Sequence, residues 1–123
     1  MIFLESNYLI RGLVPGSREG QELTACIQSG EQLVTPMLAW YEFLCGPVTT
    51  VQIQTIRAFL HDLLPFDESQ ATAAAGLFNA AGRKRALRVD AMIAATAIAA
   101  GASLATNNRN DFSAFTGSGL RLA

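Results

Sequence analysis

The chain has 123 residues, of which 50% are hydrophobic and 15% are charged, and its formal net charge is −1. This length suits one domain with a real hydrophobic core, and the high hydrophobic content excludes a disordered chain. The small net charge excludes a whole-molecule field that attracts nucleic acid, so any anion binding has to be local. Cys26 and Cys45 form no CxxC pair and do not lie near His61, which argues against a disulfide framework or a zinc site and favours a reducing cytoplasm.

The sequence also predicts a protein that does not contact membranes. No basic segment precedes the apolar residues at the start of the chain, as it does in a secretory signal peptide. The longest apolar run, around residues 91–100, is too short to span a bilayer. We therefore expect a soluble, cytoplasmic protein.

The first part of the chain predicts short strands alternating with helices. An apolar run over residues 1–4 is typical of a buried parallel strand, and Glu5 follows it directly. The next segments predict a short helix over residues 8–13 and a longer helix that ends near residue 29, with Ser17 as its N-cap. Residues 32–35 predict a second strand.

A helix over residues 36–45 follows this second strand. Thr35 is a suitable N-cap, Pro36 suits the first helical position, and a Gly-Pro pair ends the segment. Glu42 is the only charged residue in this helix. Its spacing from Leu38 and Cys45 predicts that it lies on an apolar face.

Two more helices are predicted before residue 81. Residues 50–64 carry apolar side chains at helical spacing as far as Leu63, and Pro65 ends this pattern. Asp67 and Gln70 have the spacing of a capping box, which predicts a helix over residues 68–80. Four of the nine basic residues then lie close together: Arg83, Lys84, Arg85 and Arg88.

The last part of the chain contains its most apolar helix. Residues 89–100 are apolar on every side except at Asp90 and Thr96, which is typical of a helix inside a domain. Residues 103–106 suit a buried strand, residues 107–111 form a polar loop that ends in Asp111, and residues 120–123 suit an edge strand. The alternation of strands and helices predicts an α/β sandwich around a small, mostly parallel sheet.

Ligands bind at the carboxyl ends of the strands in such sheets, where Glu5 and the loop with Asp111 are expected. Clustered carboxylates repel one another, and a divalent cation relieves that repulsion. Ligand sets made only of oxygen suit Mg²⁺ or Mn²⁺. Such an ion supports hydrolysis of a phosphodiester, and the basic segment could bind a phosphate backbone. The candidate acids are Glu5, Glu42, Asp90 and Asp111.

Each of these residues also has an ordinary structural explanation. Asp90 is favoured in the first turn of a helix by the helix dipole alone, and Asp111 fits turn chemistry. Glu42 could pair with an arginine. The basic segment could be a solvated loop.

Three segments together resemble the PIN-domain nucleases. IFLESNYLI is similar to their opening strand, TPMLAWYEFLCG to a helix that carries a glutamate, and RVDAMIAATAIAAGASLATNNRNDF to their last helix, strand and loop. These segments occur in the family's order and cover nearly the whole chain. The resemblance implies a PIN-like sandwich, with one domain over residues 1–123.

The size and layout look most like VapC-type toxins of bacterial toxin–antitoxin pairs. That resemblance implies a Mg²⁺- or Mn²⁺-dependent endoribonuclease that forms a homodimer and is inhibited by a cognate antitoxin. It places the metal ligands at Glu5, Glu42, Asp90 and Asp111. Thr106 joins these acids in the catalytic set, and the supporting polar positions are Ser6, Asn7 and Asn108.

One position departs from the family pattern, because the first acid is usually aspartate and here it is Glu5. The added methylene displaces the carboxylate by about 1.5 Å, and Mg²⁺ requires near-octahedral geometry. A second hypothesis is therefore a PIN-fold module that binds RNA or an antitoxin through a weakened metal site. A phosphatase is a third hypothesis, but the usual second acid two residues after the nucleophile is absent.

Overall fold

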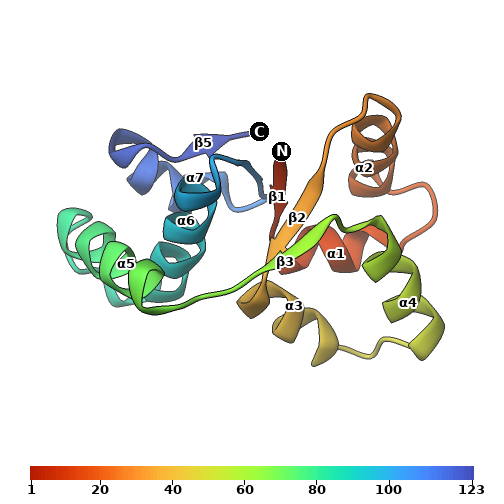
Figure 1. The fold of residues 1–123 in the computed structure, drawn as a ribbon, viewed down its shortest axis with the longest axis horizontal. Helices are drawn as coiled ribbons and strands as arrows, with labels where there is room; N and C mark the ends of the chain where they lie inside the picture. Colours follow the sequence, from red (N-terminus) through yellow and green to blue (C-terminus); the bar gives the residue numbers. More distant parts are fainter.

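The computed structural model describes residues 1–123 as a parallel sheet between two layers of helices (Figure 1). The order of the five strands across the sheet is β3-β2-β1-β4-β5, and all neighbouring pairs are parallel. The strands are β1 (Ile2–Leu4), β2 (Leu33–Pro36), β3 (Asp62–Leu64), β4 (Ser103–Ala105) and β5 (Arg121–Leu122). This arrangement confirms the predicted α/β fold.

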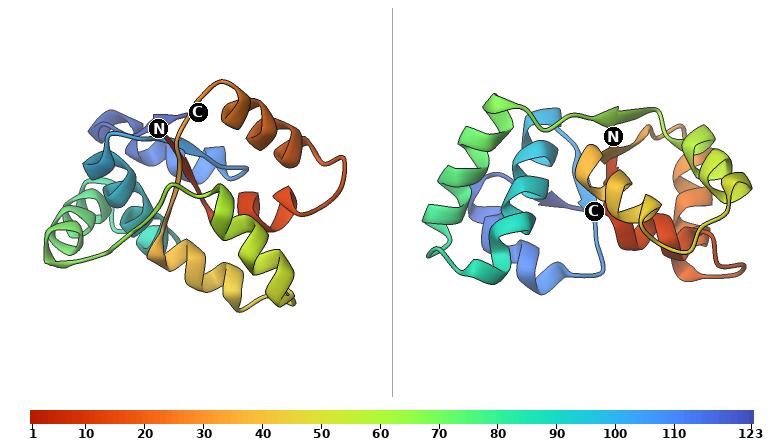
Figure 2. Two further views of the ribbon diagram at one scale, coloured as in Figure 1. Left: turned by 45° about the vertical axis from the view of Figure 1, so that its right-hand side comes forward. Right: turned by 90° about the horizontal axis from the view of Figure 1, so that it is seen from below.

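The helices divide between the two faces of the sheet (Figures 1 and 2). One layer contains α1 (Ser6–Gly12), α2 (Arg18–Gln28), α3 (Met37–Leu44) and α4 (Thr50–Phe59). The other layer contains α5 (Glu68–Ala80), α6 (Arg88–Ala100) and α7 (Arg109–Phe112), with short 3₁₀ segments at Arg85–Leu87 and Ser113–Ser118. None of the helices is long and apolar enough to cross a membrane.

The strands bury alternate residues in two separate hydrophobic clusters. Phe3, Val34 and Leu104 pack on the side of α6, whereas their chain neighbours Leu4 and Leu33 pack on the side of α1 and α4. Neighbouring strands pair in register, so that Phe3 lies beside both Val34 and Leu104. Successive side chains of a strand point to opposite faces, and both faces are covered, which explains the continuous apolar runs in the sequence.

Most of the expected element boundaries agree with the structure. Ser17 caps α2 by accepting a hydrogen bond from the Gly20 amide at 3.0 Å, and Asp67 and Gln70 form the expected capping box of α5. The buried helix α6 ends at Gly101, which adopts a left-handed conformation with φ 66°. Five of the six residues from Ala91 to Thr96 are buried, with Met92 partly exposed.

Two expectations about local structure were wrong. Thr35 does not cap α3, because it is fully buried in β2 and its hydroxyl donates to the carbonyl of Leu4 in the neighbouring strand. Pro36 is the N-cap instead. Leu63 does not extend α4, which ends at Phe59. Leu63 and Leu64 lie in the short strand β3 and pack on opposite faces of the sheet, as alternating strand residues do.

Candidate active site

The carboxyl ends of β1 and β4 lie at a topological switch point of the sheet. These neighbouring strands lead into opposite helix layers, since β1 continues into α1 and β4 continues towards α7 (Figure 2). Ligands of open α/β sheets bind at such a switch point. Helix α6 precedes β4 in the chain and runs back to the start of that strand, so its N-terminus lies at the same edge of the sheet.

Glu5 is the most deeply buried acid at this edge. It is 6% exposed and stands between β1 and α1, and its side chain does not cap the helix. One of its oxygens, Oε1, is buried without a hydrogen bond. Burial raises the pKa of Glu5, and the charge of Asp90 adds to this effect, while the Thr106 and Asn7 side chains and the Asn107 amide partly oppose it.

Asp90 lies in the first turn of α6 and is partly buried. Burial raises the pKa of its carboxyl group, and the negative charges of Asp111 and Glu42 raise it further. A carboxylate at a helix N-terminus is normally stabilised by the helix dipole. Desolvation and the like charges of Asp111 and Glu42 oppose that stabilisation here.

Glu42 reaches the same edge from α3. Ser6 donates a hydrogen bond from its hydroxyl to Glu42 Oε2 at 3.0 Å, which joins the start of α1 to α3. The expectation of an apolar face was wrong because Ala39 and Phe43 form the buried face, and Glu42 lies about 100° around the helix from Phe43 and is exposed. No arginine lies within salt-bridge distance of it.

The remaining expected site residues lie on the segment after β4 and at the start of α1. Thr106 is buried, and its Oγ1 accepts a hydrogen bond from the Asn108 amide at 2.9 Å. Asp111 is exposed in the short helix α7, so the expectation of a loop as far as Asp111 was wrong. Asn7 is exposed in α1 and lies close enough to Glu5 to affect its pKa.

The structure brings Asp90 close enough to Glu5, Glu42 and Asp111 for its charge to interact with each of them. It does not bring them into a closed cage. No three acidic, histidine or cysteine side chains lie close enough together to hold one ion.

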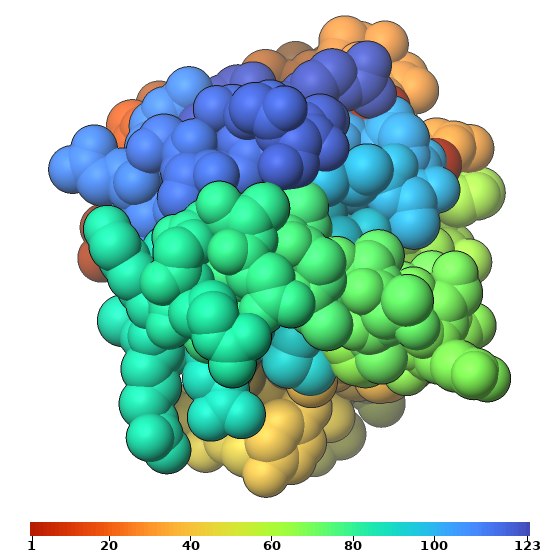
Figure 3. Space-filling view, turned by 90° about the vertical axis from the view of Figure 1, so that its left-hand side faces the viewer, coloured from red at the N-terminus to blue at the C-terminus, as the bar shows by residue number.

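The four basic residues of the segment after α5 are all exposed, and none has a carboxylate within salt-bridge distance. Arg83, Arg85 and Arg88 line an open hollow of about 330 Å³ together with Phe78. Arg83 donates a hydrogen bond to Asn79 Oδ1 at 2.6 Å and lies over the ring of Phe78. Figure 3 shows the face on which α5 lies, with long side chains of the teal segment after it projecting from one edge. Lys84 lies outside the hollow.

A polar cluster that the sequence did not predict lies on α2. Glu19 on α2 is buried, and Arg11 and Arg18 lie 3.6 and 3.5 Å from its carboxylate. Its own backbone amide lowers the pKa of Glu19 most strongly, and Asn107, Arg11 and Arg18 lower it further, against the effect of burial. No motif pointed to this cluster, and only the acid in the first turn of α2 gave a local signal.

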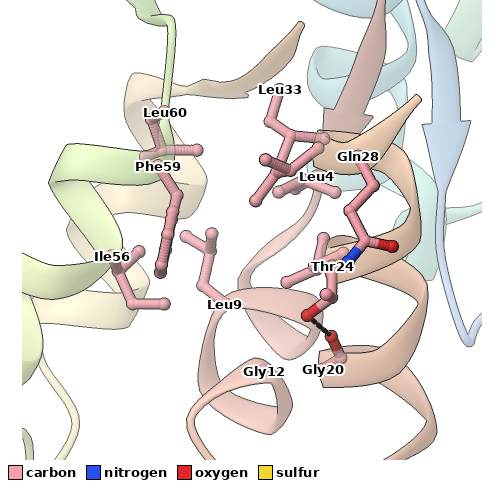
Figure 4. A pocket seen from close by; sticks show the side chains of 12 residues that line it. Leu4, Leu9, Gly12, Gly20, Thr24, Gln28, Leu33, Ile56, Phe59 and Leu60 are labelled. Carbon is pink, nitrogen blue, oxygen red and sulfur yellow. Dashed lines mark hydrogen bonds between the residues drawn. The ribbon is translucent and has the colours of Figure 1, made fainter. Parts of the chain in front are cut away.

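An apolar cavity of about 370 Å³ lies between α1, α2 and α4 (Figure 4). Leu9, Ile56 and Phe59 face it from α1 and α4, and Thr24 and Gln28 face it from α2. Thr24 donates its hydroxyl hydrogen to the Gly20 carbonyl at 2.9 Å, so little polar capacity remains on that wall. No pattern in the sequence predicted this cavity.

Several solved structures share this fold. FitAB bound to the IR36 DNA fragment is 22% identical over 100% of this chain and 94% of the other, with a TM-score of 0.78. A toxin–antitoxin complex from Klebsiella pneumoniae is 27% identical over 92% and 91% of the two chains, with a TM-score of 0.71. VapBC2 from Rickettsia felis, bound to a promoter DNA fragment, is 19% identical over 100% and 98%, with a TM-score of 0.69.

A comparison with curated proteins gives no significant match. The family model described as PIN domain matches residues 2–117. This match covers far more than half of the chain and agrees with the parallel sheet and its two helix layers. The chain therefore belongs to the PIN domain family.

Proposed function

We propose that this protein is a metal-dependent endoribonuclease that hydrolyses RNA phosphodiester bonds and acts in the cytoplasm as the toxin of a toxin–antitoxin pair. The observation that carries the proposal is the uncompensated negative charge at the switch point. Glu5 is buried and Asp90 is partly buried, the pKa of each is raised, and neither is paired with a basic side chain. Buried charge without a partner is costly, so a cation that binds there has a clear electrostatic gain.

The residues fit Mg²⁺ or Mn²⁺ in their chemistry. All donors at this edge are oxygens, and Glu5 Oε1 is buried with no hydrogen-bond partner. Mg²⁺ usually keeps several waters and binds through one or two carboxylates plus substrate phosphate. A site that is built on Glu5 and Asp90, with Glu42 and Asp111 nearby, therefore does not require three preformed ligands.

Each residue has a proposed task. Glu5 and Asp90 hold the ion, and Glu42 and Asp111 add negative charge and further oxygen ligands. A bound ion would polarise a phosphoryl oxygen and lower the pKa of a water. Ser6 orients Glu42, Asn7 and Thr106 lie beside Glu5, and the hydrogen bond from Asn108 to Thr106 fixes the Thr106 hydroxyl.

We propose that the exposed basic segment of Arg83, Lys84, Arg85 and Arg88 binds the RNA backbone. Its side chains have no carboxylate partners, and three of them converge on one hollow. Arginine binds phosphate well because its planar guanidinium presents several donors. The segment leads directly into the helix that carries Asp90, which places the basic side chains beside the acidic site in the chain.

The proposed protein partner is a cognate antitoxin. The similar structure from Klebsiella pneumoniae is a toxin–antitoxin complex, and the apolar cavity between α1, α2 and α4 would accept the apolar face of a partner's helix (Figure 4). We also propose a homodimer, because Met37, Tyr41 and Leu44 form an exposed apolar stripe at helical spacing on α3. Light scattering at micromolar concentration should give twice the chain mass, and a monomer would contradict the dimer.

The second candidate is a PIN-fold module that binds RNA or an antitoxin but has little catalytic activity. Glu5 favours it, because this longer side chain replaces the usual aspartate and is almost fully buried. The two candidates differ in whether the protein cleaves RNA when Mn²⁺ is present.

Cleavage of RNA by the purified chain with Mn²⁺ tests the proposal. The parent should cleave RNA, and Asp90→Asn should lose at least about a hundredfold in rate, because an amide oxygen is a poorer ligand and carries no charge. Glu68→Gln is the matched control, since Glu68 is the exposed acid in the first turn of α5, and it should retain the parent rate. Mn²⁺ binding without cleavage would support the binding module instead.

A further inference from the structure

Asn107 joins two distant parts of the chain through both ends of its side-chain amide. Arg18 donates from Nη2 to Asn107 Oδ1 at 2.7 Å, and Asn107 donates from Nδ2 to Glu19 Oε1 at 3.2 Å. The amide oxygen thus faces a cation, and the amide nitrogen faces a carboxylate. These contacts link α2 to the segment after β4, across 89 and 88 residues of sequence.

The α2 side of this link is firmly held. The Glu19 side chain is only 5% exposed, lies at the capped N-terminus of α2, and is flanked by two arginines. Arg18 also donates to Glu22 at 3.3 Å, and Glu22 accepts a hydrogen bond of 2.7 Å from Tyr8 on α1. The helix that begins directly after Glu5 is therefore part of the same network.

The other side of the link has few supports of its own. Strand β4 ends at Ala105 and α7 begins at Arg109, so residues 106–108 belong to neither element. The Thr106 hydroxyl and the backbone amide of Asn107 lie beside Glu5. The Asn107 side chain points the other way, to α2. One residue therefore faces both the candidate site and the helix that holds it.

We propose that Arg18 and Glu19 clamp the side chain of Asn107 and thereby position residues 106–108 against Glu5. Arg18, Glu19 and Asn107 are positioning residues that need not touch the ion or the RNA. This inference rests on the proposed function only in taking the acids at the switch point to be a metal site. Outer partners that orient ligand groups typically contribute about 10–100-fold to metal affinity or activity.

The test compares Asn107→Ala, Arg18→Ala and the double variant with Asn110→Ala as the matched control. Asn110 is an asparagine of the same segment, is exposed, and makes no side-chain hydrogen bond in the structure. The first measurement is hydrogen exchange of the Asn108 amide, whose hydrogen bond to Thr106 reports the order of the segment. The second is Mn²⁺ affinity by calorimetry, and the third is the melting temperature.

Both clamp variants should show faster exchange at Asn108 and about tenfold weaker Mn²⁺ binding. The double variant should lose little more than Asn107→Ala alone, because Asn107→Ala already removes the hydrogen bond from Arg18. Melting temperatures should remain close to that of the parent, and Asn110→Ala should match the parent in all three measurements. If Asn107→Ala does not fold, Arg18→Ala supplies the same test, because its side chain is 65% exposed.

Unchanged exchange at Asn108 in the clamp variants would overturn the clamp. Faster exchange with unchanged Mn²⁺ affinity would overturn its positioning role. A parent protein that binds no Mn²⁺ contradicts the proposed function instead, and the exchange rates alone then decide whether the clamp exists.

Discussion

Glu5 and Glu19 are both almost fully buried, yet only Glu19 has basic side chains beside it. Glu19 has two arginines and an asparagine amide around it, and its pKa is lowered. Each acid has one oxygen that is buried without a hydrogen bond, but Glu5 has no basic neighbour and its pKa is raised. The fold places basic partners beside Glu19 and none beside Glu5, and this difference is why we propose that Glu5, and not Glu19, binds a cation.

The largest expected effect comes from truncating the two acids in parallel. Glu5→Ala should reduce RNA cleavage at least about a hundredfold, because it removes a proposed metal ligand, and it should leave the fold intact in chelator. Glu19→Ala should mainly lower the melting temperature, because it leaves Arg11, Arg18 and Asn107 without their shared partner, and its loss of cleavage through the clamp should be smaller than that of Glu5→Ala. Cleavage assays and thermal melts on both variants check this. Equal effects on stability would contradict the comparison.

The pH dependence of stability in chelator should have opposite signs for the two acids. A raised pKa means that the Glu5 carboxyl group binds its proton more tightly in the folded protein than in the unfolded chain. The contribution of Glu5 to stability is therefore lost as the pH rises from its ordinary pKa of 4.5 through its raised pKa. The lowered pKa of Glu19 gives stability above 4.5, which is lost as pH falls through the lowered pKa.

Thermal melts from pH 7 to pH 3 test these signs with Glu5→Gln and Glu19→Gln. At pH 7, Glu5→Gln should melt above the parent and Glu19→Gln below it. Both differences should shrink as pH falls. The difference for Glu5→Gln should shrink first, because the Glu5 carboxyl group of the parent protonates at a higher pH than the Glu19 carboxyl group. A Glu5→Gln variant that melts below the parent at every pH would show that the Glu5 carboxylate is satisfied after all.

The same contrast applies to the arginines, with a smaller expected effect. Arg83 and Arg88 have no acidic partners, whereas Arg11 and Arg18 are occupied by Glu19. Replacing both Arg83 and Arg88 with Ala should weaken RNA binding about equally for different sequences and reduce the slope of log affinity against log salt by about 1–2. Replacing Arg11 with Ala should change RNA affinity much less. Binding titrations at several salt concentrations distinguish the pairs.

Much of the fold could be predicted because it depends on local signals. The apolar run of β1, the capping box of α5 and the all-round apolar face of α6 each specify their element without reference to the rest of the chain. Strand β3 was missed because it is short and because its two leucines continue the helical spacing of α4. Only their packing on opposite faces of the sheet identifies the strand.

The acids were found from their positions after apolar segments, but their environments were not predictable. Whether Glu42 is buried depends on how α3 is rotated against the sheet, and the spacing of apolar residues gave the wrong face. Glu19 looked like an ordinary acid in the first turn of an amphipathic helix. The cluster around Glu19 includes Asn107, which is 88 residues away in the sequence. The two residues come together only because the order of strands places β4 beside β1.

The most direct test of the central claim is thermal melting of the parent and Asp90→Asn, in chelator and in Mn²⁺. Asp90→Asn keeps the shape of the side chain and removes one of the mutually repelling charges. It should therefore melt above the parent in chelator. It should also gain less stability from Mn²⁺, because a bound ion stabilises the folded protein less when its affinity for that state is lower. A variant that melts below the parent in chelator, and that Mn²⁺ stabilises as much as the parent, would contradict the assignment of Asp90 to a metal site.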